Sequence, residues 1–576
     1  MNFRKVNNIA GWVILLIATA TYTITREPTA SFWDCGEFIA CANEIGIPHP
    51  PGSPLFTMLG RLFIVVFGGG EAANAAKSVN LLSAVASGFT ILFLFWTITH
   101  FARKMFVKHG EALTGQQTFT VMASGVVGAL AYTFSDTFWF SAVEGEVYAL
   151  SSFFTALIIW AMLKWEHAYE LAKDVVERNR ADRWIVFIFF MLGLSITVHL
   201  LNLLTVQAIV MIYFYKKYTP TVKRSVIAFL GSCVLTGLIL WGMVYIIPRT
   251  SALFDRIFVN SFNLPFFSGF TVFFILLGIL CWYLLKLAQR KGSSILRLSV
   301  WCFLFIMLGY STYVTTLIRS AANPGIDMSN VDNPATLASY FAREQYGSAP
   351  LLTGPHFGSV PAIEGNYYKI KEGRMKWGVS GNKYVELGRE RDYDYEGDQL
   401  MFFPRIWDQT NQQNHLDFYV NWLGKEQGRD PNTGRPMYYP PITQKDNFDF
   451  FFRYQMGAMY WRYFMWNFSG RQNDLQGFGN SLRDGNWQTG ISFIDKQMLG
   501  DQSKLPDSLK KNKANNKLYL LPFLLGIVGC VYQFIKKKND WIVTFLLFFF
   551  TGIAIGIYLN MPGNQPRERD YAFVGS

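Results

Sequence analysis

The chain has 576 residues, of which 51% are hydrophobic, 17% aromatic and only 16% charged. Because soluble proteins carry about 25% charged residues, this composition excludes an ordinary soluble enzyme, a disordered chain and a disulfide scaffold. The net charge of +12 could indicate nucleic-acid binding. However, the basic residues stand in short runs between apolar stretches, as membrane topology requires. We therefore expect no nucleic-acid partner, and a lipid bilayer as the environment.

Eleven apolar stretches are candidates for membrane spans, each of which needs about 20 residues. They lie at residues 8–25, 76–101, 118–134, 147–164, 184–199, 202–215, 225–247, 268–285, 298–318, 517–535 and 540–559. Residues 55–67 are also apolar, but this run is short for a span and suits a helix at the membrane surface. The sequence therefore predicts an α-helical polytopic membrane protein with about 11 transmembrane helices.

The basic residues predict the orientation of these spans. With Arg4 and Lys5 in the cytoplasm, the cytoplasmic loops and span ends hold 21 basic residues, and the short loops and span ends on the other face, without the 319–516 block, hold seven. Counting residues 55–67 as a full span would invert this bias. The positive-inside rule therefore favours eleven spans with a cytoplasmic N-terminus.

Three parts of the chain are predicted from this pattern. Residues 1–318 form a membrane module with an external loop at 26–75. Residues 319–516, rich in Trp, Tyr, Asn, Gly and Asp, form an extracytoplasmic mixed α/β domain. Its aromatic run at 454–468 is interpreted as packed core or as a segment resting on the membrane surface, rather than as a carbohydrate platform. Residues 517–576 form two further membrane helices and the start of an expected continuation.

The external loop carries the residues best suited to chemistry. If residues 31–44 are helical, Asp34 and Glu37 stand at i and i+3 and share one face. Partial burial and mutual repulsion at the membrane surface would raise the pKa of at least one carboxyl group, which suits a general base. The alternative is that Asp34 caps the helix and Glu37 faces water. The following string, His49-Pro50-Pro51-Gly52, predicts a rigid turn.

Together these strings resemble the GT-C glycosyltransferases, notably the protein O-mannosyltransferases. The string Asp34-Cys-Gly-Glu37, followed by Ile47-Pro-His49-Pro50-Pro51-Gly52, is closest to glycosyltransferase family 117. That family includes bacterial relatives of the vertebrate O-mannosyltransferase that acts on IPT domains. Two further strings support the resemblance: Glu144-Gly-Glu146-Val-Tyr148, and the segment that runs from Gly193 to His199.

The resemblance implies an inverting transfer of a sugar, with mannose as the first candidate, from a polyprenyl-phosphate donor to an extracytoplasmic acceptor. Asp34 is then the general base, and Glu37 positions a substrate hydroxyl or tunes Asp34. The leaving phosphate needs cationic or hydrogen-bonding partners. The predicted substrate-binding residues are His49, Glu146, Tyr148, His199, Arg249, Arg256 and Arg319.

Some of these residues also have a purely structural interpretation. Residues two apart on a helix cannot face each other, so we expect only one of Glu144 and Glu146, namely Glu146, to reach the substrate cavity. His199 could be a satisfied helix-end histidine beside Asn202. Arg249 and Arg256 could anchor helix ends among lipid headgroups.

The acceptor implied by the resemblance is Ser or Thr of a protein, and a glycolipid is the variant within the same class. We expect no cofactor and no metal ligand, although a carboxylate pair could hold a divalent cation. The implied location is a bacterial inner membrane, with the active site and the 319–516 domain outside the cytoplasm. Two other functions remain open: a transporter or flippase of lipid-linked glycans, and a non-catalytic envelope scaffold.

Overall fold

The computed structural model describes residues 2–108, 110–344, 349–365, 367–410, 414–431 and 435–576. The chain forms two compact units. Unit 1 comprises Met1–Gln345, Trp377–Val385 and Val531–Leu547, and unit 2 comprises Tyr346–Lys376, Glu386–Cys530 and Phe548–Ser576.

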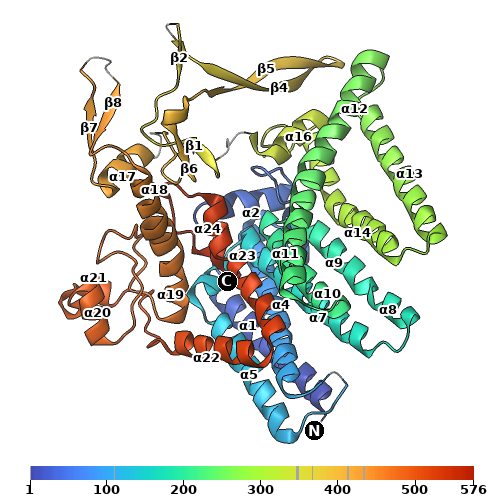
Figure 1. The fold of residues 1–576 in the computed structure, drawn as a ribbon, viewed down its shortest axis with the longest axis vertical. Coiled ribbons are helices and arrows are strands. Elements are labelled where there is room, and N and C mark those ends of the chain that lie inside the picture. The colour runs from blue at the N-terminus through green and yellow to red at the C-terminus, as the bar shows by residue number, and fades with distance from the viewer. Residues whose placement is uncertain (1, 109, 345–348, 366, 411–413, 432–434) are drawn as a thin grey trace. The chain divides into compact units, whose positions relative to one another are not determined.

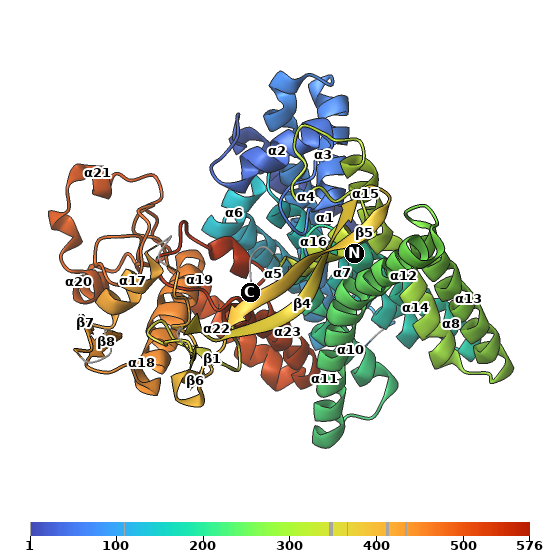
Figure 2. The same ribbon diagram turned by 90° about the horizontal axis from the view of Figure 1, so that it is seen from above.

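Unit 1 is built from helices. They are α1 (Phe3–Thr25), α2 (Asp34–Glu44), α3 (Pro54–Gly68), α4 (Ala75–Phe106), α5 (Gly115–Thr133), α6 (Asp136–Ala142), α7 (Val147–Leu171), α8 (Val175–Ala181), α9 (Arg183–Ile196), α10 (Val206–Lys217), α11 (Val222–Gly237), α12 (Ile247–Phe262), α13 (Ser268–Arg290), α14 (Ser294–Tyr310), α15 (Val314–Ser320) and α16 (Pro334–Ala342). Helix α4 packs against α1, α5 and α7 (Figure 1). Helices α2 and α3 pack on each other and on α4 (Figure 2), so the predicted external loop contains two helices held by the bundle.

The predicted polytopic helical membrane fold is confirmed. Among the described residues, seven helices are long and apolar enough to cross a bilayer, or eight if the pair α5 and α6, bent by 68°, counts as one span. One of the seven runs from Val222 to Phe262, because α11 continues through a π-helical stretch, Leu238–Ile246, into α12. The short apolar run at 55–67 forms α3, as predicted.

Three of the eleven predicted spans are shorter than expected. Helices α9, α10 and α22 (Leu521–Lys536) have 14, 12 and 16 residues, which is less than the roughly 20 residues that a span requires. Helix α9 ends at Ile196 because the chain turns into a 3-10 stretch, Leu200–Thr205. The hydroxyl groups of Thr197 and Thr205 donate to backbone carbonyls at that break. An apolar run alone does not reveal such a break.

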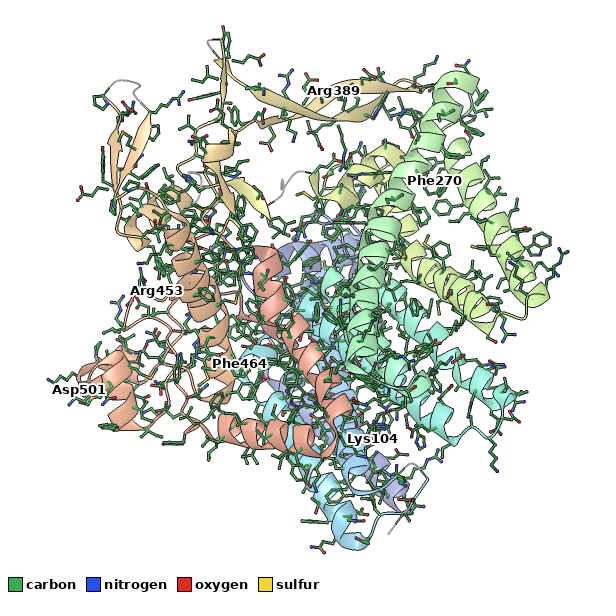
Figure 3. All side chains as sticks on the ribbon, in the orientation of Figure 1. Lys104, Phe270, Arg389, Arg453, Phe464 and Asp501 are labelled. Carbon is green, nitrogen blue, oxygen red and sulfur yellow. The ribbon has the colours of Figure 1, made fainter. Side chains whose placement is uncertain are left out.

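A buried ionic network joins four helices of unit 1. Glu166 of α7, only 2% exposed, accepts from Lys104 of α4 at 2.7 Å and from Lys216 of α10 at 2.9 Å. Lys104, labelled in Figure 3, also contacts Asp540 of α23 (Lys538–Phe550) at 2.7 Å. Lys104 and Lys216, which belong to the cytoplasmic basic residues counted above, therefore also hold the helices together.

Unit 2 combines helices with two-stranded sheets. Its strands are β1 (Thr353–Pro355), β2 (Ile363–Glu364), β3 (Tyr367–Tyr368), β4 (Ile370–Ser380), β5 (Lys383–Tyr393), β6 (Leu400–Phe402), β7 (Glu426–Arg429) and β8 (Pro436–Tyr439). They pair as β1–β6, β2–β3, β4–β5 and β7–β8. Its helices are α17 (His415–Trp422), α18 (Gln444–Asp449), α19 (Arg462–Phe468), α20 (Ser492–Leu499), α21 (Asp507–Lys510) and α24 (Ile553–Leu559).

The core of unit 2 lies along the continuous helix formed by α18, the π-helical stretch Phe450–Trp461 and α19. Tyr454, Tyr463 and Trp466 are buried there, which confirms the predicted packed aromatic run. Arg462 forms a buried ion pair with Glu568 at 2.6 Å. Strands in the described part of this unit pair only two by two, so its mixed α/β character comes from small two-stranded sheets and not from one central sheet.

The boundaries of the two compact units differ from the predicted domain boundaries at 318/319 and 516/517. Residues 319–344 pack in unit 1 because Arg319 donates to the carbonyls of Glu44 and Ile45 at 2.9 and 3.0 Å. The segment Trp377–Val385 joins unit 1 because the backbone of Tyr384 bonds the side chain of Asn260. The predicted division concerned the side of the membrane, and it stays a prediction.

Candidate active site

Helix α2 presents the two candidate carboxylates from its first turn. The predicted helix over residues 31–44 begins at Asp34, after Trp33 in a left-handed conformation with φ 68°. Phe38 and Ile39 are buried and fix the inner face of α2. Asp34 and Glu37 therefore stand in the first turn of α2, at the positive end of the helix dipole.

The turn that carries His49 is locked from two sides. Gly52, with φ 90°, donates from its backbone N–H to His49 O at 2.9 Å. Tyr340 of α16 donates to Pro48 O, and its ring occupies the space that a Cβ at Gly52 would need. Ser53 Oγ donates to Val198 O at 2.8 Å. The predicted rigid turn is thus held between α16 and the segment that precedes His199.

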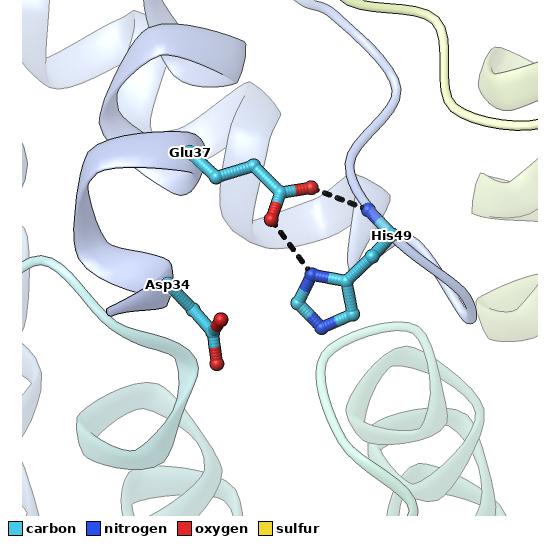
Figure 4. Close-up of side chains that lie close together, drawn as sticks. All are labelled: Asp34, Glu37 and His49. Carbon is cyan, nitrogen blue, oxygen red and sulfur yellow. Dashed lines mark hydrogen bonds and ion pairs between the residues drawn. The ribbon is translucent and has the colours of Figure 1, made fainter. Parts of the chain in front are cut away.

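Asp34, Glu37 and His49 come together in one cluster (Figure 4). Each offers a ligand atom, and these atoms all lie within 4.8 Å of one another. Glu37 Oε1 accepts from the backbone N–H of His49 at 2.6 Å, and Glu37 Oε2 lies 2.9 Å from His49 Nδ1. Because an ionised carboxylate only accepts, Nδ1 carries the proton. Both oxygens of Glu37 are therefore engaged by His49, and Asp34 points toward the same space as the imidazole.

The electrostatics correct one expectation. Burial alone would raise the pKa of Glu37, but the hydrogen bonds and the charge of His49 lower it below its ordinary value. The same hydrogen bond raises the pKa of His49, against burial, and the charges of Glu37 and Asp34 add to this effect. The sequence predicted a raised pKa for at least one of the two carboxyl groups, and Glu37 is not that group, because its pairing with His49 lowers its pKa.

This ion pair gives a pH-dependent contribution to stability. The contribution of Glu37 is complete above its ordinary pKa of 4.5 and is lost as the pH falls through its lowered folded pKa. That of His49 is complete below its ordinary pKa of 6.5 and is lost as the pH rises through its raised folded pKa. Glu37→Gln should therefore cost about 1–2 kcal/mol between pH 4.5 and 6.5, and less at higher pH, as measured by thermal unfolding.

Glu71→Gln provides the control for this experiment, since Glu71 is an exposed acid in the same external loop. Its unfolding should follow wild type at every pH. A Glu37→Gln penalty that stays constant to pH 9 would contradict the ion-pair assignment.

A second cluster lies beside the first. Cys35, Glu144 and Glu146 each offer a ligand atom, all within 4.8 Å of one another, and Glu146 is only 2% exposed. The expectation that Glu144 and Glu146 point apart is wrong. Residues 144–146 are not helical, since α7 begins only at Val147 and Glu146 N–H bonds Glu144 O at 2.9 Å.

Tyr148, two residues after Glu146 in the chain, contacts His199. Their ring centroids are 5.3 Å apart, and Tyr148 lies on the first turn of α7. His199 Nδ1 accepts from the backbone N–H of Leu201 at 3.2 Å, and Asn202 bonds the His199 carbonyl. His199 is thus a satisfied histidine at a helix end beside Asn202, as the structural interpretation predicts. Its Nε2 is the ring nitrogen that remains for a ligand.

The three predicted arginines lie at different places in unit 1. Arg319 binds the last carbonyls of α2, so it positions that helix. Arg249 lies 3.7 Å from Glu344. The guanidinium of Arg256 stacks on Trp377, 3.9 Å from the ring centroid. Phosphate binding by any of them stays a prediction.

Sequence reasoning missed Arg343. It follows α16 in a left-handed conformation with φ 53°, and its charge acts on both His49 and His199. The positive charge of Arg343 lowers the pKa of His49, against the larger opposite effect of Glu37. Its position some 290 residues after His49 gave no signal in the sequence. Only the docking of Tyr340 on the turn at Gly52 brings the end of α16 to the cluster.

The donor sets of the two clusters define where a metal ion could bind. Asp34, Glu37 and His49 offer two carboxylates and an imidazole, and Cys35, Glu144 and Glu146 offer a thiol and two carboxylates. The first set already satisfies Glu37 through His49. A divalent cation bound there would meet Asp34 and Nε2 of His49, while the Nδ1–H bond to Glu37 would orient the imidazole.

The front part of the chain is similar to proteins named as O-mannosyl-transferases. Residues 34–222 match the family described as "Protein O-mannosyl-transferase TMEM260 N-terminal domain". Residues 347–452 match a family of unknown function (DUF8416). The first match begins at Asp34 and includes His49, Glu146, Tyr148 and His199.

Two curated relatives are similar to about a quarter of the chain. "Protein O-mannosyl-transferase tmem260" of Dictyostelium discoideum is 28% identical over 157 residues, which are 27% of this chain and 17% of that protein. "Protein O-mannosyl-transferase TMEM260" of Mus musculus is 31% identical over 149 residues, which are 26% of this chain and 18% of that protein. The matched part therefore spans less than a fifth of either relative. No solved structure matches the chain.

Proposed function

We propose that this protein is a membrane glycosyltransferase that moves mannose from a polyprenyl-phosphate donor to a Ser or Thr hydroxyl of an extracytoplasmic protein. The observation that carries the proposal is the convergence of Asp34, Glu37 and His49 in the segment that is similar to protein O-mannosyltransferases. We assign the protein to the GT-C superfamily and, within it, to glycosyltransferase family 117. We further propose a bacterial inner membrane, a cytoplasmic N-terminus and an external active site.

Asp34 is the proposed general base. It takes the proton of the acceptor hydroxyl as that oxygen attacks the anomeric carbon, while the bond to the donor phosphate breaks on the opposite face of the sugar. The geometry supports Asp34 over Glu37, since both oxygens of Glu37 accept hydrogen bonds from His49. Glu37 is then a positioning residue that holds His49 protonated.

The leaving phosphate acquires negative charge and needs fixed cations. Protonated His49 and the Arg343 guanidinium are the proposed partners, because Arg343 follows α16, and Tyr340 of this helix donates to the turn that carries His49. His199, on which Arg343 also acts, is the proposed neutral donor to the same phosphate. Arg343 thus takes the role for which the sequence suggested Arg249, Arg256 and Arg319.

Arg343→Ala is expected to slow sugar transfer by about 10²–10³-fold, since loss of one fixed partner of a developing anion has effects of this size. Arg343→Lys should retain part of the rate because the charge remains without the forked geometry. The rate is measured with saturating donor in purified protein. Arg103→Ala, which removes the same charge from the last turn of α4, should transfer at the wild-type rate. Equal rates for Arg343→Ala and wild type would contradict the assignment.

Glycan profiling tests the function in the cell. A strain that lacks the gene should lose one mannose-containing glycan from envelope proteins, and the wild-type gene should restore it. Loss of a glycolipid or polysaccharide with intact protein glycans would redirect the proposal to another acceptor. Unchanged glycans of every class would contradict glycosyl transfer and favour a transporter or scaffold.

A further inference from the structure

Unit 2 contains a pocket of about 830 Å³ that lies between α17, the π-helical stretch and the loop over residues 478–487. This volume falls in the range of about 300–1,000 Å³ that is typical of small-molecule sites. Four aromatic side chains line it: Phe418, Trp422, Phe478 and Trp487. All four are half-buried, so their rings are partly available to a ligand.

Among the described residues, the ring of Trp487 has no stacking partner. Trp422 carries the Arg453 guanidinium 4.9 Å from its ring centroid, and Phe418 and Phe478 contact each other with centroids 5.6 Å apart. Within the described part of the chain, the indole of Trp487 makes no ring contact, cation–π contact or hydrogen bond. The face of Trp487 is therefore free to stack on a flat, weakly polar surface.

Amide groups surround this ring. Asn421, Asn480 and Asn486 line the pocket. Asn421 and Asn480 are exposed, and their side chains have no hydrogen-bond partner among the described residues. An amide both donates and accepts hydrogen bonds, which matches a hydroxyl group. Aromatic faces combined with such amides suit a ligand that has C–H faces and hydroxyl edges.

The wall of the pocket is preformed. The carbonyl of Gly485 accepts from Arg462 at 2.9 Å and from the Trp466 indole at 3.1 Å. Buried Asn473 donates to Arg483 O at 2.7 Å and accepts from Gly485 N–H at 2.9 Å. A loop fixed by buried hydrogen bonds holds its side chains in place before a ligand arrives, which lowers the entropic cost of binding.

The charge of the pocket points to a neutral ligand. Arg453, labelled in Figure 3, is the one charged residue among the described lining residues. Its guanidinium is already paired with Asp449 at 3.1 Å and placed over Trp422. No uncompensated charge is left among these lining residues to recognise a phosphate or a carboxylate.

We propose that this pocket is a binding site for a short, neutral oligosaccharide. A sugar ring stacks on Trp487, and its hydroxyl groups bond the amides of Asn421 and Asn480. The site lies wholly within unit 2. It does not depend on the chemistry proposed for Asp34, so either proposal can fail alone.

Ligand binding is tested with the full chain in lipid nanodiscs, because maltoside detergents would themselves present a saccharide. The probes are mannobiose, maltose, lactose and chitobiose, titrated by saturation-transfer NMR. We expect at least one probe to bind. Trp487→Ala should weaken its affinity by about tenfold, Trp487→Phe should largely restore it, and the exposed Asn421→Ala and Asn480→Ala changes should each weaken it by about threefold.

Phe493→Ala is the matched control, because Phe493 is 73% exposed in the same unit and does not line the pocket. It should bind as wild type does. The proposal is overturned if no probe binds at about 20 mM, or if Trp487→Ala and Asn480→Ala bind as well as wild type, which would place the sugar elsewhere. Binding of the peptide Gly-Trp-Gly without binding of any saccharide would also overturn it.

Discussion

Asp34→Asn is expected to lower sugar transfer by about 10²–10⁴-fold, the usual contribution of a general base. The substitution keeps the shape of the side chain and removes its capacity to accept a proton at neutral pH. Asp34 is partly exposed at the start of α2, so the variant should accumulate and unfold like wild type. The loss should appear in the rate at saturating donor, because Asp34 is proposed to act on the acceptor hydroxyl and not to hold the donor.

Glu37→Gln separates the two carboxylates. The amide oxygen of the substituted side chain can still accept from the backbone N–H of His49, so the turn is retained, but the charge that holds His49 protonated is lost. We expect a smaller loss of rate than for Asp34→Asn, with a maximum that moves to lower pH as the pKa of His49 falls. If Glu37→Gln abolished transfer and Asp34→Asn did not, the roles would be reversed.

The second large effect concerns folding. Gly193→Val is expected to prevent accumulation of folded protein, because a Cβ at Gly193 would collide with the backbone carbonyl of Ile306 on α14. On the facing helix, a Cβ at Gly309 would lie 2.6 Å from both Leu194 N and Phe190 O. The two helices thus meet backbone to backbone, where no side chain can move aside. A cost above about 4 kcal/mol is expected for such overpacking.

Gly278→Val is the matched control, since Gly278 lies in α13 with open space around its Cβ position. It should accumulate and elute from gel filtration as wild type does. Gly193→Val protein with wild-type yield and thermal stability would show that α9 and α14 do not pack as described. Because α9 ends three residues before His199, this contact also fixes the position of the candidate site.

Much of the site's location could be predicted from the sequence, but its pairing could not. The spacing of Asp34 and Glu37, and the short apolar run after Gly52, predicted α2 and α3 correctly. The bond between Glu37 and His49 depends on how the turn folds back over α2, which no local pattern encodes. Arg343 is hidden for a similar reason, since only Tyr340 and the locked turn at Gly52 bring α16 to the cluster.

The membrane helices show the same limit. Apolar runs of adequate length predicted α1, α4 and α7. The apolar stretches at 184–199 and 202–215 predicted two spans. This part of the chain instead folds as two short helices around a 3-10 stretch. Two of the lysines that set the predicted topology, Lys104 and Lys216, also pair with Glu166, which lies 62 and 50 residues away from them in the chain.

The most direct test of the account is a transfer assay with purified protein. Radiolabelled mannose on polyprenyl phosphate is supplied to wild type and to Asp34→Asn, with envelope proteins from a strain that lacks the gene as acceptors. The account predicts label on protein Ser or Thr with wild type, with inversion at the anomeric carbon, and nearly none with Asp34→Asn. Absence of label with wild type, or equal label with both proteins, would contradict it.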